Sequence, residues 1–257
     1  MAYVLAFLVG LALGSFLNVV ITRLPRGEQV IAGRSRCPHC RASLAWRDNL
    51  PLLSYFWLRG RCRSCGAPIS PRYPLVELAG GLLAAALWWR FPASPLLLAY
   101  GPFAAALLAL TVIDLEHRLL PDAITLPGIA SGLVLALILP HLPFWEAAAG
   151  AAVGALLFFG IGWIYHRLTG RQGMGGGDVK LMALIGAFLG LKALPFVIFL
   201  SAALGSLVGL GLVLIRGNWR EGNWRVAAIP YGPFLAAAAW LYLLGGQEIF
   251  RLWVGGN

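Results

Sequence analysis

Two aspartates of this sequence lie at the ends of long apolar segments, where ionisable groups are rare. Asp114 directly follows the apolar segment 96–113, and Asp178 directly precedes the segment 179–194. An aspartate at the centre of a membrane helix costs roughly 2.5–3.5 kcal/mol even by the lower estimates, so such residues tend to be functional. Two facing carboxyl groups share one proton, so that one acts as a base toward water and the other as an acid toward a carbonyl group. Asp114 and Asp178 are therefore candidate catalytic residues for peptide hydrolysis without a metal ion.

Glycines directly before Asp178 are a second candidate feature. Gly173, Gly175, Gly176 and Gly177 place no side chain where an extended substrate backbone has to approach closely. They also allow backbone conformations that other residues avoid. We expect this segment to be a substrate-binding or flexible loop.

Each aspartate also has a purely structural interpretation. Asp114 can pair with Arg118, one helical turn further on, and Asp178 can accept hydrogen bonds at the N-terminus of the helix that follows it. The residues alone leave both interpretations open.

The four cysteines form two C-x2-C pairs, Cys37 with Cys40 and Cys62 with Cys65, with 21 residues between the pairs. Each pair can direct two thiolates at one ion, and four thiolates suit a closed, tetrahedral, structural Zn²⁺ site. Two disulfides are the alternative, but disulfides are rare in the reducing cytoplasm, where the charge pattern places these residues. We expect His39 to be a surface residue or to lie just outside the metal ligands.

The elements that must position these residues are membrane helices. The 257 residues are 60% hydrophobic and 12% charged, and the mean hydropathy is +0.79. Soluble domains are roughly 45–50% apolar, so this composition indicates an all-α polytopic membrane protein. We predict about eight transmembrane helices, over residues 3–21, 75–89, 96–113, 123–139, 145–165, 179–194, 195–215 and 226–244.

The positions of the basic residues predict the orientation of these helices. Lys and Arg in short loops stay preferentially on the cytoplasmic side. With both termini outside the cytoplasm, 17 of the 20 basic residues lie on the cytoplasmic side, and Arg90, Lys192 and Arg251 do not. The net charge of +10 therefore indicates topology and contact with anionic lipid, and we expect no nucleic-acid partner.

The same pattern predicts three parts of the chain. Residues 1–22 are the first membrane helix, residues 23–73 a small cytoplasmic insert resembling a zinc ribbon, and residues 74–257 the membrane core with both aspartates. Glu77, near the start of the second apolar segment, is an interfacial residue or a polar contact to the insert.

Over nearly its whole length the sequence resembles the bacterial type IV prepilin leader peptidases, which are membrane aspartyl proteases with a GxGD motif. The residues that carry this resemblance are the paired cysteines and the segments 14–25 (GSFLNVVITRLP), 70–77 (SPRYPLVE), 114–121 (DLEHRLLP), 173–178 (GMGGGD) and 229–234 (IPYGPF). The two catalytic aspartates of the family correspond to Asp114 and Asp178.

The resemblance implies that this chain, in a bacterial inner membrane, cleaves the leader from type IV prepilins or type II secretion pseudopilins at the cytoplasmic face. The cysteine insert further implies methylation of the new N-terminus with S-adenosylmethionine. Two other functions stay open: a peptidase without methylation, and a transporter or assembly scaffold with a zinc-ribbon docking module. A transporter is expected to show inverted repeats and broken helices, and neither is evident in the sequence.

Overall fold

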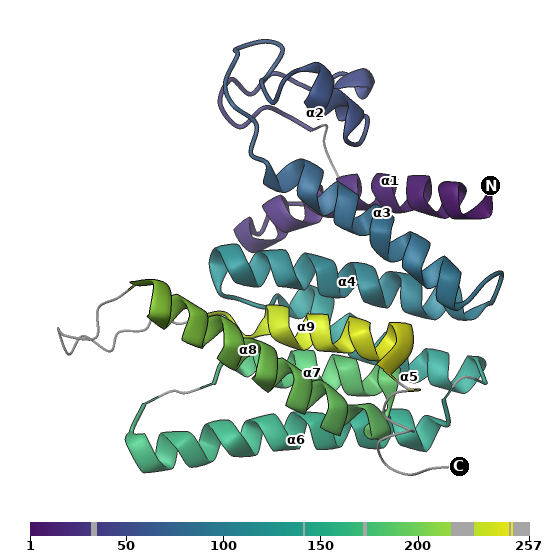
Figure 1. Cartoon of the computed structure of the whole chain (residues 1–257), viewed down its shortest axis with the longest axis vertical. Helices are drawn as coiled ribbons and strands as arrows, with labels where there is room; N and C mark the ends of the chain where they lie inside the picture. Colours follow the sequence, from purple (N-terminus) through teal and green to yellow (C-terminus); the bar gives the residue numbers. More distant parts are fainter. Residues whose placement is uncertain (32–34, 141, 172–173, 217–228, 247, 249–257) are drawn as a thin grey trace. The chain divides into compact units, whose positions relative to one another are not determined.

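The computed structural model describes residues 1–31, 35–140, 142–171, 174–216, 229–246 and 248. Within these residues every regular element is helical, and the only β-type pairings are two isolated bridges in the insert. The all-α class predicted from the sequence is therefore confirmed (Figure 1).

Each of the eight predicted apolar segments contains a helix, and residues 226–228 of the last segment lie outside the described residues. These helices are α1 (Ala2–Arg23), α3 (Arg72–Arg90), α4 (Leu96–His117), α5 (Asp122–Ile138), α6 (Phe144–Thr169), α7 (Gly176–Leu189), α8 (Leu194–Arg216) and α9 (Gly232–Leu241). The short elements are α2 (Leu53–Trp57), the 3-10 turns η1 (Leu24–Arg26), η2 (Trp46–Asn49) and η3 (Leu191–Ala193), and the π-helical turn η4 (Tyr242–Gly246).

The predicted number of eight membrane spans is not confirmed. Among the described residues, four helices are long and apolar enough to cross a membrane, namely Ala2–Arg26, Leu96–His117, Phe144–Thr169 and Leu191–Ile215. Helix α7 has 14 residues, because the chain turns at Gly190 with a positive φ of 80° inside the predicted segment 179–194. Hydropathy continues through such turns, so apolar segments in a sequence can be longer than the helices they form.

The chain divides into two compact units, residues 1–109 and residues 110–257. In the first unit α1 packs along α3 at glycine contacts. A Cβ atom added to Gly10 would lie 2.4 Å from the carbonyl oxygen of Gly80, and one added to Gly14 would lie 2.7 Å from the Cα atom of Glu77. Small residues thus let the two helices approach closely.

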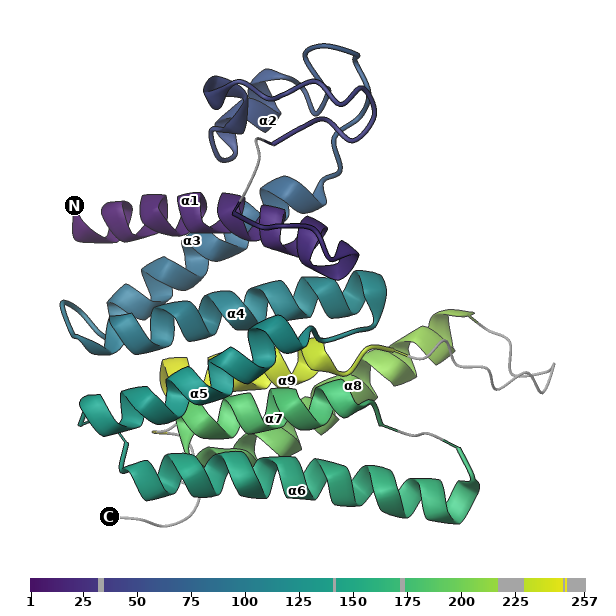
Figure 2. The same cartoon turned by 180° about the vertical axis from the view of Figure 1, so that it is seen from behind.

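In the second unit α7 is the most buried helix, with every residue from Leu181 to Leu189 buried. It packs against α5 and α6, between which it lies in Figure 2, and also contacts α9. A Cβ atom added to Gly186 would lie 2.2 Å from the carbonyl oxygen of Gly150 in α6. This packing fixes the first turn of α7, which carries Asp178.

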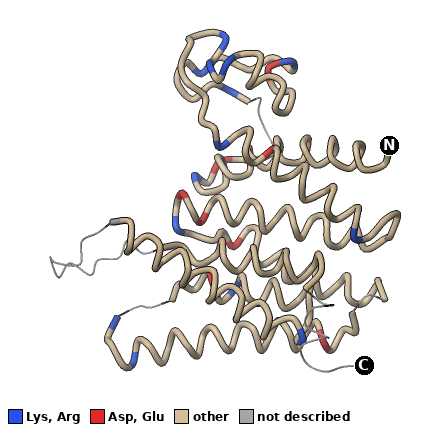
Figure 3. Tube along the Cα trace, viewed as in Figure 1, with Lys and Arg blue, Asp and Glu red and all other residues tan. Residues whose placement is uncertain are grey.

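Charged residues are confined to few places in each unit. Figure 3 shows long stretches of helix without any charged residue, and basic residues gathered in the insert. An aspartate such as Asp114, within the candidate span Leu96–His117, is therefore exceptional in its surroundings.

Candidate aspartyl site and four-cysteine cluster

Asp114 lies in the last turn of α4, and its side chain is buried with 6% exposure. Its Oδ2 atom accepts a hydrogen bond of 3.0 Å from the backbone N–H of Gly232. Gly232 is the first residue of α9, and the first N–H groups of a helix have no partner within the helix. The positive end of the helix dipole also favours a carboxylate at this position. The start of α9 therefore forms a binding site for the Asp114 carboxylate.

A side chain at position 232 would displace the Asp114 carboxylate. A Cβ atom there would lie 2.6 Å from Oδ2 of Asp114, too close for any real contact. The preceding residue is held in place as well, because the Tyr231 hydroxyl and the Ser201 hydroxyl form a hydrogen bond of 2.8 Å, and Ser201 is fully buried. The sequence interpretation gave the segment 229–234 no role, because a backbone N–H donor carries no side-chain signature.

Asp178 is the third residue of α7 and is half-buried. The Asp114 carboxylate is close enough to repel a negative charge on Asp178. The structure thus brings the two predicted aspartates into one electrostatic environment, although they are 64 positions apart in the chain. Their catalytic role stays a prediction.

The structural interpretation finds no supporting contact for Asp114 and one supporting contact for Asp178, whose carboxyl group accepts a hydrogen bond from the backbone N–H of Gly175. Among the described residues Asp114 forms no ion pair with Arg118, and the bond between these residues is the backbone one from the Arg118 N–H to the Asp114 carbonyl oxygen, of 2.9 Å. The N-cap residue of α7 is Gly175, and no side chain caps that helix.

The loop between α4 and α5 is tied to the first turn of α7 by two contacts. Lys180 of α7 forms an ion pair with Asp122, the first residue of α5. A Cβ atom added to Gly177 would lie 3.0 Å from the Cβ atom of Leu120. These contacts hold the loop that follows Asp114 against the turn that carries Asp178. Sequence reasoning did not find the pair of Lys180 with Asp122, because its members lie on different helices.

The predicted glycine loop is partly described. Gly173 lies outside the described residues. Gly175 and Gly176 are exposed, and a Cβ atom added to Gly176 would meet no atom within 4 Å. Space therefore exists beside this segment, and its binding of substrate stays a prediction.

The four cysteines lie together in the insert of the first unit. Their sulfur atoms are all within 4.8 Å of one another, and the Sγ atoms of Cys37 and Cys65 are 3.9 Å apart. A tetrahedral ion with Zn–S bonds of about 2.3 Å requires sulfur atoms about 3.8 Å apart. All four cysteines are free in the structure, so the disulfide alternative has no support, and the donor set fits zinc. His39 is exposed and not part of the cluster.

The two cysteine pairs lie in two copies of one turn. In the first copy the N–H of Cys37 donates to the carbonyl oxygen of Ala42 at 3.0 Å, and in the second the N–H of Cys62 donates to that of Ala67 at 2.8 Å. The sequence carries this duplication as R-C-x-x-C-x-A at 36–42 and again at 61–67, a signal that the sequence interpretation missed. Two equivalent turns present two pairs of thiols to one point.

Backbone N–H groups of Cys65 and Ser64 donate toward the sulfur of Cys62 and lower the pKa of its thiol to about 7. A thiolate is the form that binds metal, so the turn prepares this sulfur for coordination at neutral pH.

The insert is attached to α3 through Glu77, which is 9% exposed. Its Oε2 atom accepts a hydrogen bond of 2.8 Å from the N–H of Leu52. Of the two roles that the sequence suggests for Glu77, the polar contact to the insert is confirmed.

Comparison with known proteins gives a family match in each of the two units. Residues 8–91 match the family model described as the bacterial peptidase A24 N-terminal domain, and residues 101–210 match that of the type IV leader peptidase family. A protein of Aeromonas hydrophila named prepilin leader peptidase/N-methyltransferase is 43% identical, over 96% of this chain and 92% of its own length. A protein of Pseudomonas putida with the same name is 41% identical, over 96% and 91%. No solved structure matches the chain significantly.

Proposed function

This chain belongs to the type IV leader peptidase family, and from this premise we propose that it is a membrane aspartyl endopeptidase that removes the leader of prepilins or pseudopilins. The names of its relatives include N-methyltransferase, so the proposal extends to methylation of the new N-terminus with S-adenosylmethionine. The observation that carries the peptidase proposal is the buried Asp114, held by the N–H of Gly232 and within electrostatic reach of Asp178.

The geometry suggests which carboxyl group is charged and which is protonated before the reaction. Each carboxyl group accepts one backbone hydrogen bond, Asp114 from the N–H of Gly232 and Asp178 from that of Gly175, and the charge on Asp114 in addition opposes a second negative charge on Asp178. We assign the charged form to Asp114 and the shared proton to Asp178. Mutual repulsion opposes negative charge on both carboxyl groups at the same time.

Hydrolysis then proceeds by acid–base catalysis. Asp114 takes a proton from water as the water oxygen attacks the scissile carbonyl carbon, and Asp178 gives its proton to the carbonyl oxygen. When the tetrahedral intermediate collapses, the C–N bond breaks, the leaving amine takes up the proton held by Asp114, and a hydroxyl group of the intermediate returns a proton to Asp178, so that both carboxyl groups regain their starting forms. Gly176, where an added Cβ atom would meet no atom within 4 Å, leaves room for the substrate backbone near Asp178.

We further propose that the four cysteines hold one structural Zn²⁺ that orders residues 23–73, between the first helix (1–22) and the peptidase core (74–257). The positive-inside pattern supports a cytoplasmic insert and extracytoplasmic termini in the bacterial inner membrane. A single cysteine introduced at position 43 of a cysteine-free variant is then protected from an impermeant thiol reagent in intact cells. Labelling there would overturn this topology.

The transporter and scaffold alternatives have lost their support, because full-length relatives carry the peptidase name. One experiment tests the proposed function as a whole. The purified protein is incubated with a prepilin, with and without S-adenosylmethionine, and the product is weighed by mass spectrometry. Loss of the leader is expected in both samples, and one added methyl group is expected only with the methyl donor. An uncut prepilin contradicts the peptidase, and a cut but unmethylated one contradicts the methyltransferase.

A further inference from the structure

Large apolar side chains lie exposed on one face of the insert. Trp46 in η2 is 79% exposed, and Leu53, Phe56 and Trp57 in α2 are 67%, 71% and 84% exposed. Residues 53, 56 and 57 are spaced i, i+3 and i+4, so they share one side of the helix. Because η2 packs against α2, Trp46 belongs to the same part of the insert. We refer to these four residues as the apolar face of the insert.

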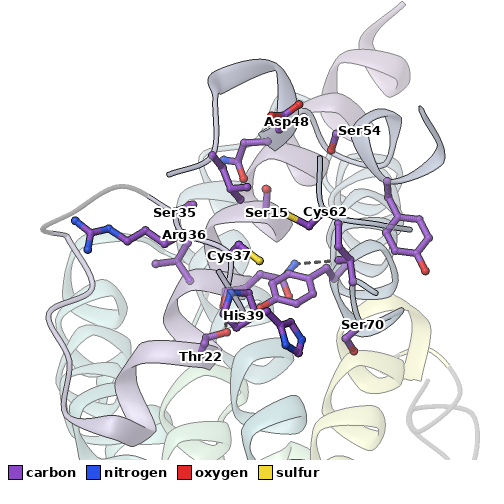
Figure 4. Close-up of a pocket in the computed structure, with 18 of the residues that line it drawn as sticks. Ser15, Thr22, Ser35, Arg36, Cys37, His39, Asp48, Ser54, Cys62 and Ser70 are labelled. Atoms are coloured by element: carbon purple, nitrogen blue, oxygen red, sulfur yellow. Dashed lines mark hydrogen bonds between the residues drawn. The ribbon is translucent and has the colours of Figure 1, made fainter. Parts of the chain in front are cut away.

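The other side of α2 faces the rest of the first unit. Ser54 and Tyr55 line a pocket of about 980 Å³ together with Ser15 and Thr22 of α1. Figure 4 shows Ser15, Thr22 and Ser54 around this pocket. Residues with hydroxyl groups therefore lie toward the protein, and the apolar residues of α2 lie away from it. A surface helix of a soluble domain has the opposite arrangement, with its apolar side buried.

The chemistry around the apolar face matches a lipid bilayer. Large exposed apolar patches mark interaction sites, and tryptophan is enriched where membranes meet water. Residues 49–76 include no Asp or Glu but four arginines, namely Arg59, Arg61, Arg63 and Arg72. Of these, Arg59 and Arg61 directly follow α2 and are exposed. Guanidinium groups bind phosphate oxygens, so this segment offers apolar side chains for acyl chains and basic ones for headgroups.

The hydrogen bond of Leu52 places the apolar face at the depth of a membrane helix. The N–H of Leu52 donates to Glu77 at 2.8 Å, and Glu77 packs against Gly14, where an added Cβ atom would lie 2.7 Å from the Cα atom of Glu77. Gly14 is the middle residue of the candidate span Ala2–Arg26. One side chain and one hydrogen bond bridge less than two helical turns, roughly 11 Å. Half of the hydrocarbon core measures about 15 Å, so Leu52, directly before α2, lies beside the membrane part of α1.

We propose that the apolar face is a membrane anchor, seated in the leaflet that surrounds the C-terminal half of α1. In the proposed topology this is the cytoplasmic leaflet. Its four side chains enter the boundary between headgroups and acyl chains, as those of interfacial helices do. Arg59 and Arg61 contact the lipid phosphates. The lipid bilayer is the occupant because the Leu52 hydrogen bond holds the start of α2 at bilayer depth. The anchor does not depend on the proposed peptidase or methyltransferase activity.

An anchor at this place gives α2 a fixed point on each side. The hydrogen bond from Leu52 to Glu77 ties the start of α2 to α3. Lipid around the apolar face holds the opposite side of the same short helix. The insert then keeps one orientation relative to α1 and α3, and the four-cysteine cluster stays at a constant distance from the membrane surface.

Photo-crosslinking of the full-length protein in nanodiscs tests the anchor. The nanodiscs contain phosphatidylethanolamine and phosphatidylglycerol, and p-benzoylphenylalanine replaces Phe56, where it keeps an aromatic ring. The same group in place of Ser64 is the matched control, because Ser64 is an exposed residue of the insert outside the apolar face. After irradiation, mass spectrometry measures the fraction of each peptide that has gained a lipid. We expect about tenfold more lipid adduct at position 56 than at position 64.

Hydrogen exchange tests the anchor without a photoreactive group. A helix as short as α2 is marginal in water, so its backbone N–H groups exchange slowly only where something covers them. Phe56→Ser and Trp57→Ser together should speed exchange over residues 46–57 by about tenfold in nanodiscs. Trp89→Ser is the matched control, because it removes a tryptophan of 66% exposure near the other end of α3. It should leave this exchange unchanged. Helix content at the wild-type level shows that both variants are folded.

The outcomes separate lipid from protein partners. A crosslink from position 56 to a second copy, to a prepilin or to another part of the same chain contradicts the anchor and assigns the apolar face to a protein contact. Equal lipid adducts at positions 56 and 64, or no adduct at 56, also contradict it, as does unchanged exchange in the folded double variant. Lipid adducts at position 56 in a protein that cuts no prepilin support the anchor while contradicting the proposed function.

Discussion

The backbone N–H of Gly232 donates a hydrogen bond of 3.0 Å to Oδ2 of Asp114, across 118 positions of the chain. Such a donor stabilises negative charge on Asp114, and this charge in turn opposes a second charge on Asp178, although Asp178 also accepts a hydrogen bond from the backbone N–H of Gly175. The contact from α9 therefore favours one charge on Asp114 and one proton on Asp178, which the proposed mechanism needs.

Gly232→Ala is expected to impair cleavage through this contact. The added Cβ atom would lie 2.6 Å from Oδ2 of Asp114, so either the carboxylate or the start of α9 has to move. A displacement of about 1 Å in a catalytic group can reduce the rate by on the order of 100-fold. Methylation of a pilin that has already been cut should be unaffected. The measurement is the rate of prepilin cleavage by each purified variant.

Gly160→Ala provides the control for this substitution. Gly160 lies within α6, and a Cβ atom there would meet nothing within 4 Å. This variant should cleave like the wild-type protein. Equal rates for Gly232→Ala and Gly160→Ala contradict a positioning role for Gly232.

The ion pair of Lys180 with Asp122 is expected to affect cleavage more than stability. Both side chains are more than a third exposed, at 37% and 57%, and exposed ion pairs contribute about 0–1 kcal/mol to the free energy of unfolding. The pair nevertheless ties the loop after Asp114 to the turn of Asp178. We expect Lys180→Met to lower kcat by about tenfold through misplacement of the aspartates, with little change in KM or in the unfolding temperature.

A charge exchange distinguishes positioning by this ion pair from contact with substrate. In the double variant Asp122→Lys, Lys180→Asp the ion pair can re-form with reversed charges, so part of the lost kcat should return. If the double variant is slower than both single variants, Lys180 acts in some other way than through Asp122.

Zinc binding by the insert is expected to weaken on acidification. The folded turn lowers the pKa of Cys62 from 9.0 to about 7. In the metal-free insert this thiolate stabilises the fold fully above the unfolded pKa of 9.0, and the contribution is lost as the pH falls through about 7. Protons compete with the metal for the same sulfur, so zinc affinity should fall more steeply below about pH 7.

Titration with a chromogenic chelator at a series of pH values measures this affinity. One zinc per chain is expected at pH 8, and Cys62→Ser should lose the metal while α1 and α3 stay folded. Freshly purified wild-type protein without zinc contradicts the site.

The helix positions could be predicted from the sequence, because apolar segments report burial in lipid directly. Both aspartates and the four cysteines could be predicted as well, since each combines a reactive side chain with a characteristic spacing. Helix ends are different. Helix α7 ends before Gly190 because the backbone at this residue has a positive φ of 80°. A hydropathy profile carries no information about backbone conformation, so it does not indicate this helix end.

The remaining features depend on contacts between distant residues. Gly232 acts through its N–H and through the absence of a side chain, and Lys180 is distinguished by its ion pair with Asp122 on another helix. Neither contact can be predicted from the type of residue at these positions. Such features appear only when the helices are placed, because burial and pairing are properties of the packed structure.

The strongest prediction concerns the aspartates themselves, because burial, the Gly232 donor and mutual repulsion all act on the same pair. Asparagine keeps the size and hydrogen-bonding shape of each residue but can neither accept the proton from water nor return it. Asp114→Asn and Asp178→Asn should each lower cleavage by about 1,000-fold or more, and the double variant should be scarcely slower, because residues that act as a unit are not additive. Binding of S-adenosylmethionine and zinc content should stay unchanged, which shows that the variants are folded. Glu248→Gln, an exposed carboxylate, should cleave normally. Near-normal cleavage by a folded Asp178→Asn protein would rule out the aspartyl mechanism, and loss of cleavage on zinc removal alone would assign the chemistry to the metal instead.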